Sequence, residues 1–245
     1  MSSESKPTVP IRSFDIPIDK CGGSICVQIT EPAVRADNLT LTTWASSFIL
    51  ASQLHLLSIP SPLESTVESI PILELGAGTG LVGLTLSTLF RCPVILTDLP
   101  GIVPGLAANI TLNAALLLEN GGSATCGALD WSNPSELVLH SGQCYSSAKK
   151  ARAILAADTV YDPDHPTLLS GAILEWLERT EDARVILTYP LRVAYLDEVR
   201  ALWEQLDAGG LQAIDEGRET AEGDIWDDER LCEWCVWKWK EATLS

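Results

Sequence analysis

The chain has 245 residues, 46% of them hydrophobic, which is enough for one α/β domain with a sizeable core. Its 33 acidic residues against 16 Lys and Arg give a formal net charge of −17. This charge argues against binding to nucleic acid, because a phosphate backbone is bound by a basic surface. No apolar run reaches the roughly 18 residues that a membrane-spanning helix needs, so we expect no membrane contact either.

The N-terminal part predicts a tail, a hairpin and a helix. Residues 1–10 are polar and contain proline, which is typical of a loose tail. The segments 13–18 and 24–30 alternate apolar and polar residues around a CGG turn, a pattern that predicts a β-hairpin. Thr43 is expected to cap a helix whose apolar residues recur at helical spacing. The N-terminus has no secretory signal, so we expect a cytoplasmic or nuclear protein.

After a linker over residues 58–71, strands alternate with helices. The predicted parallel strands are 71–75, 92–98, 123–129, 152–157 and 183–189. The predicted helices are 81–90, 106–118, 166–177 and 195–206. Segments 210–214 and 234–239 are expected to add an antiparallel pair at the sheet edge. The predicted fold is α/β: a Rossmann-like, seven-stranded, mostly parallel sheet with helices on both faces, an antiparallel last strand and a small N-terminal β-hairpin.

Two features near the C-terminus allow more than one interpretation. The connector DEGRETAEGDIWDDER, residues 215–230, holds eight acids and two arginines. Such a run is usually a solvated loop, and a lip that attracts a basic substrate is the alternative. Cys232 and Cys235 form a CxxC at the start of the last predicted strand, where we expect the thiols to point in similar directions. One such pair is half a zinc site, so we expect reduced thiols here rather than a metal or redox centre.

The stretch ILELGAGTG is the strongest functional signal. A buried strand ends at Leu75, and glycines follow at 76, 78 and 80. Glycine permits tight turns and lets a backbone approach a ligand closely. Asp98 ends the neighbouring strand, 22 residues after Gly76. Ligands of doubly wound sheets bind at the carboxyl ends of the strands, where such a carboxylate can accept hydrogen bonds from ribose hydroxyls.

The glycine pattern distinguishes between two classes of cofactor. Dinucleotide enzymes usually show GxGxxG, but the position that this pattern wants as glycine is Leu81. Glu74 would place a negative charge near a pyrophosphate, whereas it suits a ligand that carries an amino group and a sulfonium. The turn therefore favours S-adenosyl-L-methionine, with S-adenosyl-L-homocysteine as product, over NAD.

Several blocks together resemble a known family. ELGAGTGLVG, TDLP, LDW and AADTVYDP, preceded by TTWASSFILA, resemble methyltransferase family 16, the seven-β-strand protein-lysine methyltransferases of the methyltransferase-like 21 group. The resemblance is clear over about residues 40–190. It implies a fold with a reversed last strand, in agreement with the predicted edge pair. We expect two parts in the chain: residues 1–60, a tail, hairpin and helix packed on the core, and residues 61–245, a single S-adenosylmethionine-dependent methyltransferase domain.

The resemblance also assigns cofactor-binding residues, and it does so position by position. Trp44 would lie against the methionine end, and Asp130 and Trp131 of the LDW block would lie beside adenine. Ala157, the small residue before the DxxY block, would also contact the cofactor. The remaining assignments follow the turn and the strand tip: Glu74, Gly76, Ala77, Gly78 and Asp98. For both tryptophans, ordinary packing is the alternative.

Asp158 and Tyr161 form the DxxY signature, which the resemblance places beside the transferable methyl group. Methyl transfer is an in-line attack by a neutral amine, so the enzyme mainly aligns nitrogen, carbon and sulfur. Asp158 can hold the amine, and Tyr161 can wall the channel or orient Asp158. A carboxylate near lysine also favours the ammonium form, which cannot attack. We therefore interpret Asp158 as a positioning group rather than a strong base.

Other polar residues carry weaker signals. Tyr189, Arg192 and Tyr195 could line the substrate side, with surface or packing roles as the alternative. The three histidines are dispersed and are interpreted as structural, and no metal is expected.

The sequence thus predicts a class I S-adenosylmethionine-dependent protein-lysine N-methyltransferase. Its expected partner is a folded protein such as a translation elongation factor or chaperone, with the enzyme a monomer. A small-molecule N-methyltransferase and a catalytically silent binding module with the same fold are the alternatives.

Overall fold

The computed structural model describes residues 10–31, 35, 36, 39–57, 59, 70–223, 226 and 230–244. The predicted tail and almost all of the predicted linker lie outside these residues. None of the helices within the described ranges is long and apolar enough to cross a bilayer.

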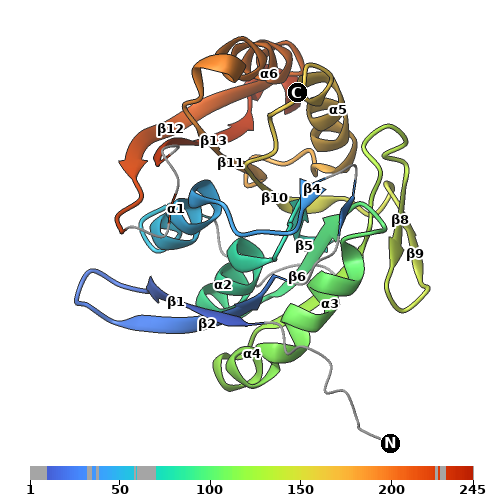
Figure 1. Ribbon diagram of the computed structural model, residues 1–245. Coiled ribbons are helices and arrows are strands. Elements are labelled where there is room, and N and C mark those ends of the chain that lie inside the picture. Colours follow the sequence, from blue (N-terminus) through green and yellow to red (C-terminus); the bar gives the residue numbers. More distant parts are fainter. Residues whose placement is uncertain are drawn as a thin grey trace, which may run out of the picture.

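The centre of the molecule is a nine-stranded sheet in the order β12-β13-β11-β10-β5-β6-β7-β8-β9 (Figure 1). Its strands are β5 (Ile70–Leu75), β6 (Pro93–Asp98), β7 (Ser123–Ala128), β8 (Glu136–Leu139), β9 (Cys144–Ser146), β10 (Ala151–Ala157), β11 (Arg184–Pro190), β12 (Leu211–Thr220) and β13 (Leu231–Trp239). The five strands from β11 to β7 are parallel, and β13 runs antiparallel to β11 and β12. The predicted Rossmann-like class with a reversed last strand is confirmed.

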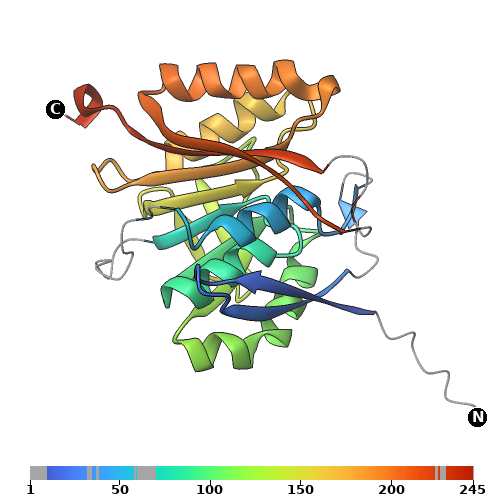
Figure 2. The ribbon, with the colours of Figure 1, turned by 90° about the vertical axis from the view of Figure 1, so that its left-hand side faces the viewer.

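Helices cover both faces of the sheet (Figures 1 and 2). The helices are α1 (Ala45–Gln53), α2 (Leu81–Phe90), α3 (Val103–Leu112), α4 (Ala114–Asn120), α5 (His165–Trp176), α6 (Leu196–Ala208) and α7 (Glu241–Leu244), with a 3-10 turn η2 (Val193–Tyr195) before α6. Apolar residues of α1 to α4 share one buried cluster with one face of the sheet. Those of α5 and α6 share a second cluster with the other face. The strands are therefore buried on both sides, which explains their continuous apolar runs.

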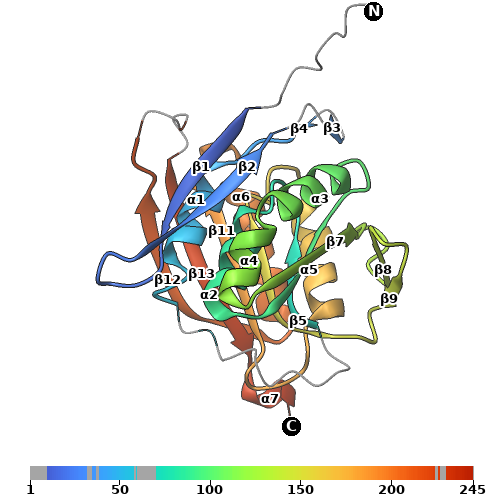
Figure 3. The ribbon, with the colours of Figure 1, turned by 90° about the horizontal axis from the view of Figure 1, so that it is seen from below.

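The N-terminal hairpin pairs β1 (Ile11–Pro17) with β2 (Ser24–Thr30), as predicted, and packs on the helices rather than the sheet (Figure 3). Two asparagines of the 103–120 helical segment form hydrogen bonds with backbone N–H and C=O groups of β2. Asn109 accepts a 2.9 Å hydrogen bond from Thr30 N and donates one to Thr30 O. Asn113 bonds in the same way to the backbone of Gln28. Asn113 also separates α3 from α4, so the single helix predicted over 106–118 is in fact two. A two-residue pair, β3 (Arg35–Ala36) and β4 (Leu39–Thr40), follows the hairpin.

Strands β8 and β9 extend the sheet by an antiparallel pair that the sequence analysis did not predict. β8 pairs with β7 at Gly127 and Ala128. A Cβ added at Gly127 would lie 2.6 Å from Val138 O, so the glycine allows this close approach.

Three further expectations are corrected by the structure. β12 extends to Thr220, so the first part of the acidic connector is a strand and not a loop. The N-cap of α1 is Trp44, while the Thr43 amide donates to Glu31 Oε1 at 2.8 Å. Cys232 belongs to the cluster on one face of the sheet and Cys235 to the cluster on the other. Residues three apart on a strand point to opposite faces, so these thiols cannot act as a pair.

Candidate active site

The turn after β5 forms the floor of a cavity at the carboxyl ends of the parallel strands. Gly76, Gly78 and Gly80 all have positive φ angles, of 64°, 53° and 84°. A Cβ on Gly76 would lie 2.8 Å from Thr159 Cγ2 and 3.2 Å from the Trp131 ring, so side chains from two other loops fill that space. A Cβ on Gly78 would meet nothing within 4 Å. The turn is thus packed from one side at Gly76 and open at Gly78.

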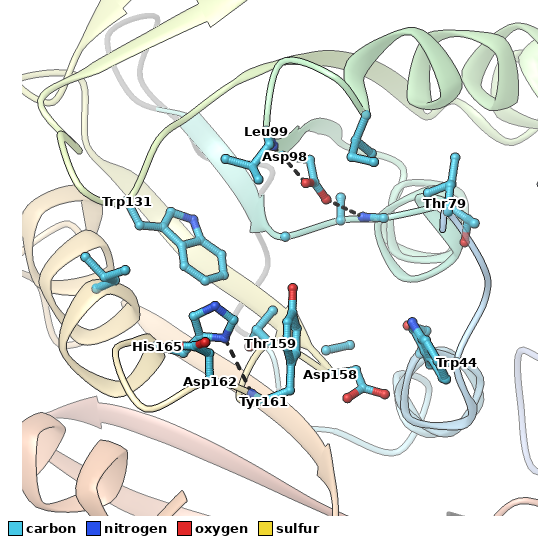
Figure 4. Close-up of a pocket in the computed structure, with 18 of the residues that line it drawn as sticks. Trp44, Thr79, Asp98, Leu99, Trp131, Asp158, Thr159, Tyr161, Asp162 and His165 are labelled. Carbon is cyan, nitrogen blue, oxygen red and sulfur yellow. Dashed lines mark hydrogen bonds between the residues drawn. The ribbon is translucent and has the colours of Figure 1, made fainter. Parts of the chain in front are cut away.

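Asp98 lies at the tip of β6 and is hydrogen-bonded to the same turn (Figure 4). Its Oδ2 accepts from Gly78 N at 2.8 Å, and its Oδ1 accepts from Leu99 N at 2.7 Å. Burial raises the pKa of the Asp98 carboxyl, while the two backbone donors act in the opposite direction. Each oxygen accepts one backbone hydrogen bond and keeps a lone pair for a ligand hydroxyl.

Asp158 lies at the opposite end of the cavity, directly after β10. Its φ of 57° is rare for a residue with a side chain, and such strain is common at functional sites. Its Oδ1 accepts from Arg192 Nη1 at 2.7 Å, and its Oδ2 accepts from Arg192 Nη2 at 3.2 Å and from Ser46 Oγ at 3.1 Å. The side chains of Asp158 and Arg192 are only 5% and 12% exposed, so this is a buried, two-pronged ion pair.

Three rings form one wall of the cavity (Figure 4). His165 packs edge-on against Tyr161, with ring centroids 4.4 Å apart, and against Trp131 at 6.0 Å. Its Nδ1 accepts a 3.4 Å hydrogen bond from Tyr161 N. Burial lowers the pKa of His165, which favours the neutral ring that this acceptor role requires. The sequence predicts only a structural role for His165, because its contact with Trp131 joins residues far apart in the chain.

Trp44 closes the Asp158 end of the cavity from the start of α1 (Figure 4). It is 38% exposed, and the guanidinium carbon of Arg192 lies 5.7 Å from its ring centroid. This geometry is that of a cation–π contact. Trp44 therefore lies at the mouth of the cavity and also packs against the ion pair.

These groups line one cavity of about 1070 Å³. The predicted site residues among its lining are Trp44, Gly76, Ala77, Gly78, Asp98, Asp130, Trp131, Ala157, Asp158 and Tyr161. Arg192 and Tyr195 also line it, whereas Tyr189 is buried and hydrogen-bonded to Glu233 and Trp203. Of the acidic lining residues, Asp130 is held in a local turn, where its Oδ1 accepts from Ser132 N at 2.8 Å. The structure thus brings together residues from the segments that follow β5, β6, β7, β10 and β11 and from the start of α1.

Glu74 is absent from this lining, contrary to the prediction. It is 2% exposed, and its Oε2 accepts a 2.9 Å hydrogen bond from Gly83 N within α2. Burial raises the pKa of the Glu74 carboxyl to about 8, so at neutral pH it is mostly uncharged. Glu74 lies on the α2 face of β5, below the turn. It therefore links strand to helix and does not offer a charge to a ligand.

The sheet order and the glycine turn facing Asp98 define a Rossmann-like fold with a ligand site at the strand ends. Solved structures agree in fold: the glycopeptide N-methyltransferase MtfA, complexed with sinefungin, aligns with a TM-score of 0.53 at 11% sequence identity, over 81% of this chain and 88% of that one. A family model described as lysine methyltransferase matches residues 26–198. The chain belongs to this lysine methyltransferase family, which confirms the predicted resemblance.

Curated relatives carry the corresponding names. The protein-lysine N-methyltransferase rrg1 of Schizosaccharomyces pombe is 32% identical over 216 residues, which is 88% of this chain and 67% of rrg1. The protein-lysine N-methyltransferase EFM2 of Saccharomyces cerevisiae is 32% identical over 217 residues, which is 83% of this chain and 49% of EFM2. The matched region thus spans about two thirds of the first relative and half of the second.

Proposed function

We propose that this protein is an S-adenosylmethionine-dependent protein-lysine N-methyltransferase. The observation that carries the proposal is that a nucleoside-type site, made by Gly78 and Asp98, and a polar aromatic mouth, made by Asp158, Tyr161 and Trp44, open into the same cavity. Family membership and the names of the relatives support the same activity.

The residues present fit the cofactor. Gly78 leaves open space where a side chain would stand, and Asp98 presents a half-buried carboxylate with unused lone pairs. Trp131 offers a flat apolar wall for adenine, with Asp130 next to it at the cavity rim. In this proposal Ala77 and Ala157 give the ligand room, and Trp44 packs on its methionine end.

The acceptor end aligns an amine for attack. Bound S-adenosylmethionine supplies a methyl group on a sulfonium, which transfers to a neutral amine. Asp158 would accept a hydrogen bond from the amine and so orient the nitrogen. Tyr161 and Trp44 would enclose the lysine side chain, whose methylene groups pack well on aromatic rings. The ammonium proton leaves to water before the transfer.

The finer parts of the proposal concern partners and organisation. We propose an elongation factor or chaperone as the acceptor. We also propose that the enzyme is a monomer with a cytoplasmic or nuclear location, and all three proposals rest on features of the sequence. We also propose that residues 1–60 and 61–245 act as one unit. Ser46 of the first part bonds to Asp158, and the Thr43 and Thr79 hydroxyls are 3.1 Å apart, so the N-terminal part helps to build the site.

The test is incubation of the purified protein with methyl-labelled S-adenosylmethionine and an extract of cells that lack it. We expect one labelled protein band whose modified residue is a lysine by mass spectrometry, and no band with Asp158→Ala. Label in a metabolite alone would indicate a small-molecule methyltransferase. Calorimetry that detects no binding of S-adenosylmethionine would indicate a silent binding module.

A further inference from the structure

The proposed function leaves a chemical conflict at the acceptor end, and the inference that follows rests on that function. A lysine amine must be neutral to attack a methyl group. A carboxylate close to the amine stabilises the ammonium form and raises the amine pKa by about one to three units. Asp158 on its own would therefore orient the nucleophile and suppress it at the same time.

The structure places a permanent cation on that carboxylate. Arg192 donates to both oxygens of Asp158, in the planar two-pronged geometry that a guanidinium favours. The guanidinium stays protonated at any physiological pH. The pair is therefore close to neutral overall, although Asp158 still presents a hydrogen-bond acceptor at this end of the cavity.

Backbone hydrogen bonds hold Arg192 in this position. Its amide donates to Pro190 O at 2.9 Å, and its carbonyl accepts from Tyr195 N at 3.0 Å at the end of η2. Leu191 N donates to Leu231 O at 2.9 Å, which ties the segment to β13. The Trp44 ring also contacts the guanidinium, whose carbon lies 5.7 Å from the ring centroid. Because these contacts fix Arg192, it is better suited to be a permanent partner of Asp158 than a counter-ion that each substrate displaces.

We propose that Arg192 is a positioning residue that holds Asp158 in place and balances its charge, so that the acceptor lysine enters the site as a neutral amine. Asp158 then orients the nitrogen without trapping its proton. Among the described residues that line the cavity, Arg192 is the only permanent cation.

The other polar groups that contact Asp158 or line the cavity are the same in the wild type and in every variant of Arg192. Ser46 of α1 donates to Asp158 and does not titrate. The remaining ionisable side chains in the cavity lining are Asp98, Asp130, Tyr161, Asp162, His165 and Tyr195. They are unchanged in a variant of Arg192, so a comparison at that position isolates the contribution of the guanidinium.

The test compares three substitutions. Arg192→Gln and Arg192→Met remove the charge, and the methionine keeps an apolar contact with Trp44. Arg192→Lys keeps the charge but loses the two-pronged geometry. Arg200→Gln, on the exposed side of α6 where Arg200 pairs with Asp197, is the matched control. The acceptor protein found by labelling is purified, and kcat is measured against pH at saturating acceptor, because kcat reports the ionisation of the bound complex.

We expect both neutral variants to move the acidic limb of the kcat profile to higher pH, by about one unit or more. At pH values below the acidic limb, each pH unit of this shift lowers kcat by about tenfold. Arg192→Lys lowers kcat but leaves the limb at the wild-type pH, and Arg200→Gln changes neither. Calorimetry should show that S-adenosylmethionine affinity is not lowered in the neutral variants, because the cation that they remove repels the sulfonium.

Each other outcome contradicts the inference. An equal loss of kcat in the Lys, Gln and Met variants, with the limb unmoved, would show a purely geometric role. Loss of folding in both neutral variants would show that the ion pair serves stability, and loss of cofactor binding in folded variants would show that it serves the cofactor site. If the wild-type protein labels no acceptor at all, the proposed function is wrong and the inference with it. If it labels an acceptor and the limbs coincide, only the inference is wrong.

Discussion

Gly78 N donates a 2.8 Å hydrogen bond to Asp98 Oδ2, which ties the turn after β5 to the tip of β6, 20 residues further along the chain. The bond orients the carboxylate before any ligand is present, so no free energy of binding is spent on fixing it. The glycine turn and the acid therefore form one binding element, although they belong to different strands.

Asp98→Ala is expected to weaken cofactor binding far more than Asp158→Ala. Hydrogen bonds to a charged group contribute about 1.5–3 kcal/mol, so the Kd for S-adenosylmethionine should rise by roughly tenfold to a hundredfold in Asp98→Ala. Asp158→Ala should abolish methyl transfer with a smaller change in Kd. Calorimetry with the cofactor and the labelling assay measure the two effects.

The control for this comparison is Asp197→Ala, at an exposed position on α6. It should match the wild type in both assays. An equal loss of cofactor affinity in Asp98→Ala and Asp158→Ala would place Asp158 against the cofactor and not against the acceptor.

Gly76→Ala should destabilise the protein more than Gly78→Ala. Both residues have positive φ, so both substitutions strain the backbone by about 1–2 kcal/mol. Only the Cβ at position 76 also meets Thr159 Cγ2, at 2.8 Å. Chemical denaturation measures the two free energies of unfolding.

A double variant tests the cause of that difference. Thr159→Ser deletes the Cγ2 atom, so it should recover part of the stability lost in Gly76→Ala and none of that lost in Gly78→Ala. Additive effects of Gly76→Ala and Thr159→Ser would mean that the contact is not the reason for the glycine.

Glu74 should make the wild-type protein less stable as the pH rises. The folded chain holds the carboxyl proton up to about pH 8, whereas the unfolded chain releases it near the ordinary value of 4.5. Between these values the unfolded state binds fewer protons, so the free energy of unfolding falls with pH, by at most about 1.4 kcal/mol per unit. The variant Glu74→Gln lacks this pH-dependent contribution to the free energy of unfolding, and its side-chain oxygen can still accept a hydrogen bond from Gly83 N.

Urea denaturation across this pH range provides the measurement. The stability of Glu74→Gln relative to the wild type should increase from about pH 5 to about pH 8. Glu119→Gln, on the exposed side of α4, should parallel the wild type throughout. Parallel curves for Glu74→Gln as well would show that the buried carboxyl is ionised in the folded state.

The seven cysteines should divide into two classes towards a thiol reagent. Cys21, Cys26 and Cys144 are exposed and should react quickly in the native protein. Cys92, Cys126, Cys232 and Cys235 are buried and should react only after unfolding. Burial raises the pKa of the Cys235 thiol to about 12, so little of the reactive thiolate exists at neutral pH. A fourth fast thiol in the native state would contradict the burial of these four cysteines, and a Cys232–Cys235 disulfide by mass spectrometry would contradict their assignment to opposite faces of the sheet.

Part of this fold could be read from local patterns. The strand ending at Leu75, the glycine turn and the strand ending at Asp98 follow from apolar runs and from glycine's freedom at positive φ. Parallel strands bring their carboxyl ends to one edge, so the meeting of Asp98 with the turn could also be inferred. Strands β8 and β9 were missed because they are short, and their pairing depends on a glycine in another strand.

The predicted site residues also divide into those that local sequence patterns place correctly and those that depend on tertiary contacts. Glu74 was assigned to the cofactor because it precedes the turn, but its position on the strand points it at α2. His165 shows no local signal for its contacts with Tyr161 and Trp131.

The sequence by itself determined the strand-turn-helix units, the glycine turn and the acids at the strand ends, because short-range sterics and hydrophobic periodicity encode them. Only the tertiary structure decided which charges meet. Arg192 reaches Asp158 across 34 residues because β11 lies beside β10 in the sheet, and strand order is set by packing over the whole core. That pairing turns an isolated carboxylate into a balanced ion pair at the mouth of the cavity.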